Sequence, residues 1–221
     1  MTNRNTLWRA LGALALAQAA MAAQAQILAP GTTIPVFGTT LAASPSLDGT
    51  VVQDRTRTFS FASATGSVTG QLEDRVVKAD DGTFDFYWRI SVDAGSTGRV
   101  FDLYLSNFTD ELAHALVANY RLDGVGTVPV KAAARSADGS QITFDFSDGP
   151  AAGQTTYLLF LDTQATHYAD TAFAKLGGTD GGISPALSTW SASPVPEAPA
   201  SALMLAGGAA LALLRRATRR R

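Results

Sequence analysis

The sequence contains no cysteine and only two histidines among its 221 residues. Without cysteine the chain cannot form disulfides, thiolate metal sites or a cysteine nucleophile. His114 and His167 lie 53 residues apart and belong to no metal-spaced motif, so we expect no metal and no cofactor. The chain also lacks a Gly-x-Ser-x-Gly elbow and a glycine-rich phosphate loop before a helix. These absences favour a protein that is not an enzyme.

Charge is unevenly placed along a chain whose net charge is −2. Residues 1–26 and 196–221 are basic, whereas residues 27–195 hold 10 basic and 18 acidic side chains. Binding to phosphate groups needs clustered lysine and arginine. The acidic middle therefore argues against nucleic acid as a partner, and the two basic ends need a separate explanation.

The first 25 residues have the layout of a secretory signal peptide. A basic beginning is followed by an apolar, alanine- and leucine-rich stretch over residues 10–23 that is expected to be helical, and then by a small-residue site, Ala23-Gln24-Ala25. We expect signal peptidase to cut before Gln26, with Ala20-Met21-Ala22 as a second option. The general secretion machinery would then export the rest of the chain.

The other end has three parts: a proline-rich segment, an uncharged apolar run over residues 200–214 and an arginine cluster. The 15 apolar residues would form a helix of about 22 Å, shorter than the ~30 Å core of a bilayer. Because arginines stay on the cytoplasmic side, a transient inner-membrane anchor would leave the body facing the periplasm. The proline-rich segment contains Pro196, Glu197 and Pro199, and the cluster consists of Arg215, Arg216, Arg219, Arg220 and Arg221.

This three-part end resembles the PEP-CTERM sorting signal of exported proteins in Gram-negative bacteria. In that family a Pro-Glu-Pro motif precedes a short transmembrane helix and an arginine-rich terminus. Pro196 and Glu197 match the first two positions, whereas Ala198 occupies the third and Pro199 follows one residue late. The resemblance implies that an exosortase, a membrane cysteine protease or transpeptidase, recognises and removes residues 196–221. It also implies an association with exopolysaccharide and biofilm, since that sorting system accompanies polysaccharide export.

The segments between the two ends follow the period of β-strands. In residues 84–92 every even position is apolar, and comparable runs recur near residues 56–61, 67–77, 101–105, 116–122, 142–146 and 156–161. Six Asp-Gly pairs separate or flank these runs, and Asp-Gly favours tight hairpins. This pattern predicts an all-β fold, an antiparallel β-sandwich of jelly-roll-like type.

The predicted organisation has four parts: a signal peptide over 1–25, a sandwich over 26–183, a flexible linker over 184–195 and the sorting tail over 196–221. The linker is predicted because its residues are rich in serine, alanine and proline. Within the sandwich, we expect one strand face to be buried and the intervening Asp85 and Arg89 to be exposed. That buried face consists of Phe84, Phe86, Trp88 and Ile90.

Few side chains of the body are candidates for chemistry. The adjacent acids Glu73-Asp74, Asp80-Asp81 and Asp110-Glu111 would serve a glycoside hydrolase only if two of them faced each other across a sugar. Asp80-Asp81-Gly82 and Thr179-Asp180-Gly181-Gly182 offer hard oxygens for Ca²⁺ but read better as hairpin turns. Tyr87 lies among polar residues and would either stack on a sugar or pack against a second layer.

The sequence is compatible with three functions. The leading one is a non-catalytic exported surface or matrix protein that an exosortase processes and that is destined for the cell surface or the medium. A carbohydrate-binding module without catalysis is the second, and it requires an exposed aromatic platform. A secreted glycoside hydrolase is the third, and it requires a cleft with paired carboxylates.

Overall fold

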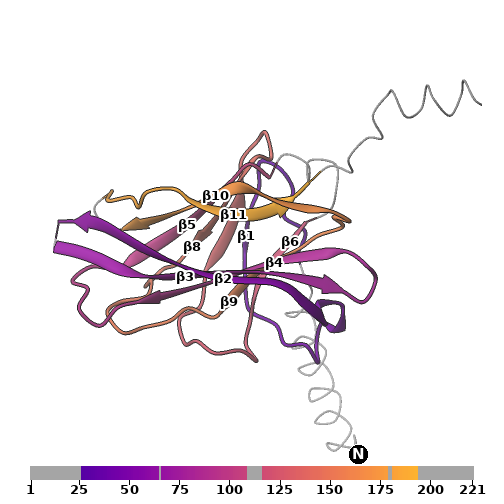
Figure 1. Cartoon of the computed structure of the whole chain (residues 1–221), viewed down its shortest axis with the longest axis horizontal. Coiled ribbons are helices and arrows are strands. Elements are labelled where there is room, and N and C mark those ends of the chain that lie inside the picture. Colours follow the sequence, from indigo (N-terminus) through magenta and orange to yellow (C-terminus); the bar gives the residue numbers. More distant parts are fainter. Residues whose placement is uncertain (1–25, 65, 109–115, 179–180, 194–221) are drawn as a thin grey trace, which may run out of the picture.

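The computed structural model describes residues 26–64, 66–108, 116–178 and 181–193. These residues form two antiparallel sheets that lie one over the other, the arrangement of a β-sandwich (Figure 1). The strands are β1 (Thr33–Pro35), β2 (Gly49–Ser63), β3 (Gly66–Ala79), β4 (Phe84–Val92), β5 (Val100–Ser106), β6 (Val117–Arg121), β7 (Ala132–Arg135), β8 (Gln141–Asp145), β9 (Leu158–Asp162), β10 (Tyr168–Gly178) and β11 (Leu187–Ala192), and a short 3-10 helix, η2, spans Pro45–Leu47.

The six-stranded sheet has the order β1-β7-β8-β5-β10-β11, and the five-stranded sheet has the order β2-β3-β4-β9-β6. Three antiparallel pairs are nested along the chain, namely β7 with β8, β6 with β9 and β5 with β10. Successive pairs alternate between the two sheets. The chain from β5 to β10 is therefore one long hairpin that folds back and forth across the core.

The core lies between the sheets and receives alternate residues from both. Phe86, Trp88 and Ile90 are at most 1% exposed, and Phe84 is partly buried against them. From the other sheet Leu103, Leu105, Ile142 and Phe144 are fully buried. The inward face predicted for residues 84–92 is thus confirmed, and β4 begins and ends at the residues that the alternation predicts.

Of the five Asp-Gly pairs that the structure describes in full, two lie in the hairpin turns for which they are suited. Gly82 joins β3 to β4 with φ +93°, and Gly139 joins β7 to β8 with φ +75°. Both values lie in the left-handed region that glycine adopts at no steric cost. Asp48-Gly49 is different, since it precedes and opens the long strand β2 rather than turning between paired strands.

The outer face of the five-stranded sheet departs from the prediction, because Asp85 and Tyr87 are each only 1% exposed. Leu47 of η2 packs over this face together with Tyr87, Phe160 and Val77 as a second, smaller core. The alternation predicts Asp85 in solvent, and that prediction is wrong because this second core covers the face. Arg89, two residues beyond Tyr87 along β4, remains partly exposed.

The predicted linker over residues 184–195 is also wrong for most of its length. Ser184 is buried and β11 pairs with β10 along the edge of the six-stranded sheet. Thr189 and Trp190 are 1% and 8% exposed, so this segment belongs to the core despite its serine- and alanine-rich composition. The sandwich therefore extends to Ser193, whose N–H donates to the carbonyl of His167 over 3.0 Å.

Candidate functional site

The sorting-tail residues Pro196, Glu197 and Pro199, the five terminal arginines and the signal-cleavage residues Ala23 and Ala25 lie outside the described residues. Within the described ranges, no helix is both long and apolar enough to cross a bilayer. The export and sorting predictions therefore stay predictions, and the candidate sites within the described residues all belong to the sandwich.

The adjacent acids Glu73 and Asp74 point to opposite faces of β3 and take part in different ion pairs. Glu73 accepts from Arg75 over 2.9 Å and also pairs with Arg89. Asp74 faces inward and is bound by Arg55. Because successive side chains of a strand point to opposite faces, this pair does not form the facing carboxylates that a glycoside hydrolase uses.

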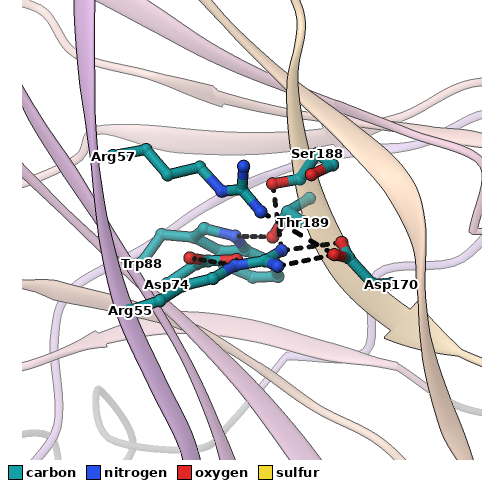
Figure 2. A network of polar contacts seen from close by, with 7 residues as sticks. All are labelled: Arg55, Arg57, Asp74, Trp88, Asp170, Ser188 and Thr189. Carbon is teal, nitrogen blue, oxygen red and sulfur yellow. Dashed lines mark hydrogen bonds and ion pairs between the residues drawn. The ribbon is translucent and has the colours of Figure 1, made fainter.

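A network of polar contacts joins the two sheets through Arg55 (Figure 2). Its Nε donates to both Asp74 carboxylate oxygens over 2.9 Å, while Nη1 and Nη2 donate to the two oxygens of Asp170 over 2.6 and 2.7 Å. Nη2 also donates to the carbonyl of Ser188 over 3.0 Å. The guanidinium carbon lies 3.7 Å from the centre of the Trp190 ring. One arginine thus connects β2 and β3 to β10 and β11.

Electrostatics distinguish the two carboxylates of this network. Burial raises the pKa of Asp74, and the charge of Arg55 opposes that rise. The hydrogen bonds from Arg55 lower the pKa of Asp170, which is more exposed. Asp170 lies where the register of β10 against β11 shifts, between Ala169 and Ala172, and such bulges re-aim side chains. Both carboxylates are engaged by the same guanidinium, so the network is suited to holding the sheets together.

A second buried acid, Asp85, has one unpaired oxygen. Thr163 N–H donates to its Oδ1 over 3.2 Å, whereas Oδ2 is buried without a hydrogen-bond partner. Burial and the nearby charge of Asp162 raise the pKa of Asp85 to about 8. The group is therefore mostly protonated at neutral pH. The described residues contain no cluster of three or more histidines and acids that could hold a metal ion.

The outer face of the six-stranded sheet carries an open groove of about 240 Å³. It crosses β5, β8 and β10, and Ile183 from the β10–β11 connection contributes to one wall. Tyr104 lines the groove and is 37% exposed, whereas Phe173 lies next to the groove on the same face, opposite the lining residue Ser106, and is 48% exposed. The groove is also lined by four polar residues, Ser106, Gln141, Thr143 and Lys175.

The register fixes how these side chains neighbour one another. Tyr104 lies between Lys175 on β10 and Thr143 on β8, and Phe173 lies opposite Ser106. Tyr104 and Phe173 are therefore diagonal neighbours, about 7–8 Å apart at their Cα atoms. Two aromatic rings and several hydrogen-bonding groups share one exposed face, and this groove is the candidate binding site of the described chain.

The remaining sequence candidates contribute less. Tyr87 is buried against Phe160 and so offers no face to a sugar. The carboxylate of Asp81 accepts from the N–H and hydroxyl of Thr83 within its hairpin turn. His167 is exposed beside Thr166. His114, the acids at 110–111 and Asp180 lie outside the described residues.

Comparison with protein-family models, with curated protein sequences and with solved structures gives no match to this chain.

Proposed function

We propose that the chain is an exported, non-catalytic surface or matrix protein whose C-terminal tail is removed by an exosortase and which associates with exopolysaccharide. The observation that carries this proposal is the joint presence of a signal-peptide layout and of the proline-rich, apolar and arginine-rich parts at opposite ends of one chain. Each part is a weak signal alone, but their order and spacing are typical of a sorted protein.

The extent of the sandwich supports this proposal. Ile27, just after the expected first cut, already pairs with Val117, and the last pairing of β11 is at Ala192. The two expected processing segments therefore flank a folded unit that is complete between them. Cleavage at either expected site would therefore leave the described strands and their pairings in one piece.

The state of the acidic side chains supports a non-catalytic body. Glu73 and Asp74, which the sequence suggests as a pair, serve separate arginine contacts on opposite faces of β3. The nested order of β5 to β10 further favours the jelly-roll-like variety of sandwich, an architecture that occurs in many binding and structural proteins.

The proposed route has three steps. The general secretion machinery and signal peptidase export the chain, residues 200–214 hold it transiently in the inner membrane, and the exosortase then releases it toward the cell surface. The body faces the periplasm during the second step because the terminal arginines remain cytoplasmic. Glu197 is the one charged side chain in the segment presented to the enzyme.

Glu197→Ala tests the proposal in a Gram-negative host that contains the matching exosortase. Mass spectrometry should find a shortened wild-type protein, whereas the variant should accumulate at full tail length in the membrane fraction. Ser201→Ala, a change in the apolar run, is the matched control and should be processed normally. If wild type and Glu197→Ala both remain membrane-bound with intact tails, the tail is a plain anchor and the proposal fails.

A further inference from the structure

We infer that the groove over β5, β8 and β10 binds a neutral polysaccharide chain, with Tyr104 and Phe173 stacking on its sugar rings. The inference deepens the proposed function and rests on it, since that function places the protein among polysaccharides without saying which residues contact them. Three properties of the face support it: its shape, its charge and the groups left free on it.

Tyr104 forms a fixed platform. Its hydroxyl donates to Asp102 Oδ2 over 3.0 Å, and its ring leans across Gly177 of the neighbouring strand. A Cβ built on Gly177 would lie only 2.9 Å from Cε2 of this ring. The glycine and the hydrogen bond together keep the ring against the sheet. A ring held in this way presents its outer side to solvent, and it loses little conformational freedom when a ligand stacks on it.

Polar groups beside the two rings are available to a ligand. Within the described residues, no hydrogen bond or ion pair engages the side-chain amide of Gln141, the Thr143 hydroxyl or the Lys175 ammonium group. These groups provide donors and acceptors around an apolar platform. A sugar ring has the matching character, since its C–H faces are apolar and its hydroxyl rim both donates and accepts.

The charge of the face selects among polymers. Two carboxylates, Asp102 and Asp145, lie opposite each other on β5 and β8, and Lys175 is the one cation that β5, β8 and β10 place on this outer face. A face with more acid than base repels phosphate and carboxylate polymers. A neutral chain fits it better.

Backbone pairing excludes a peptide that adds to the sheet here. β5 is hydrogen-bonded to β8 on one side and to β10 on the other, and both of those strands have a further partner. Strand addition needs a free edge, which none of the three strands offers. Recognition at this groove must therefore come from side chains, as it does when aromatic rings and polar groups bind a glycan.

The test measures binding of neutral hexasaccharides to the full chain, purified in a detergent without a sugar headgroup. Calorimetry with cellohexaose, laminarihexaose and mannohexaose should give saturable binding for at least one of them. Tyr104→Ala and Phe173→Ala should each weaken that binding about tenfold. Gly177→Ala should weaken it too, because the new Cβ displaces the Tyr104 ring, whereas Tyr104→Phe keeps the ring and should retain most of the affinity.

Phe37→Ala is the matched control, because Phe37 is 61% exposed and follows β1 at the far edge of the same sheet. It should bind as the wild type does, and melting curves should show that all variants are folded. Absence of binding to every neutral probe, equal binding by all variants, or a preference for polygalacturonate would overturn the inference. Glu197 is unchanged throughout, so this experiment and the tail-processing experiment can fail independently.

Discussion

The indole Nε1 of Trp88 donates a hydrogen bond to the hydroxyl of Thr189 over 2.9 Å, between two residues that are 101 positions apart. Trp88 belongs to β4 of one sheet and Thr189 to β11 of the other. The hydrogen bond crosses the core and links β11 to β4, the central strand of the five-stranded sheet. Both side chains are about 1% exposed, so water does not compete for either group.

Trp88→Ala should lower the free energy of unfolding by about 3–5 kcal/mol, because it leaves a large cavity and removes the indole donor from the Thr189 hydroxyl. Urea denaturation followed by circular dichroism measures this change. Phe37→Ala removes an exposed ring and should cost less than about 0.5 kcal/mol. Similar midpoints for the two variants would contradict the assignment of Trp88 to the core.

Truncation separates the tail from the fold. A chain ending at Ser193 should melt at the same temperature as the full chain, because the last pairing of β11 is at Ala192. A chain ending at Ala186 loses β11, and with it the Thr189 hydroxyl bound by Trp88 and the Trp190 ring beside Arg55, so it should melt well below the other two or fail to fold. Calorimetry of the three chains measures this, and equal melting temperatures would show that β11 adds no stability.

Arg55→Ala should destabilise the protein by about 3 kcal/mol, since it leaves the buried carboxylate of Asp74 without its cation. Asp54→Ala is the control, because Asp54 is 44% exposed and pairs with Arg75 at the surface. Such a pair contributes about 0–1 kcal/mol. Urea denaturation at low salt compares the two variants, and equal losses would show that the inter-sheet network adds no more than a surface ion pair does.

Asp85 should make stability depend on pH. Its pKa is about 8 in the folded protein and about 3.9 in an unfolded chain. The stability that it contributes is therefore fully present below about pH 4 and is lost as the pH rises through about 8. The loss is at most about 1.4 kcal/mol for each pH unit in that window.

Asp85→Asn isolates this contribution from the other acids, because the amide is neutral in both states and keeps the acceptor for Thr163. Urea denaturation at each pH from 4 to 8 should show the variant gaining stability relative to the wild type as the pH rises. Asp162, Asp81 and Tyr87 are the titrating neighbours of this site, and they are common to both proteins. A difference that stays constant across the range would refute the raised pKa.

The sequence predicts β4 to the residue because the alternation of apolar and polar positions there is strict. It does not predict what covers the outer face of that strand. Leu47 reaches Tyr87 from 40 positions earlier in the chain, and no local pattern in residues 84–92 carries that information. Asp85 is consequently placed in solvent by the pattern and in the interior by the fold.

The Arg55 network and the groove over β5, β8 and β10 are likewise hidden from the sequence, because both depend on contacts between strands that are far apart in the chain. Arg55 meets Asp170 and Ser188 across 115 and 133 positions. The sequence does not reveal β11 because its serine-rich composition is typical of a linker, although Thr189 and Trp190 are buried. The sequence does contain a signal for the groove, since Tyr104 is an aromatic residue at an otherwise polar, outward position of its strand. Tyr87 occupies the same kind of position in β4, and only the fold shows that Tyr104 is exposed whereas Tyr87 is buried.

The position of β11 also determines where the proposed membrane tether leaves the sandwich, relative to the groove. Eight residue steps separate Ala192 from Ala200, where the apolar run begins, and they reach at most about 28 Å, so the proposed tether would keep the end of β11 within that distance of a bilayer that holds residues 200–214. Tyr168 of β10 lies opposite Ala192, and Lys175 is seven residues further along, or about 23 Å at the rise of a strand. In the proposed membrane-held state, the groove would therefore lie about 23 Å along β10 from the point at which the tether leaves the sandwich.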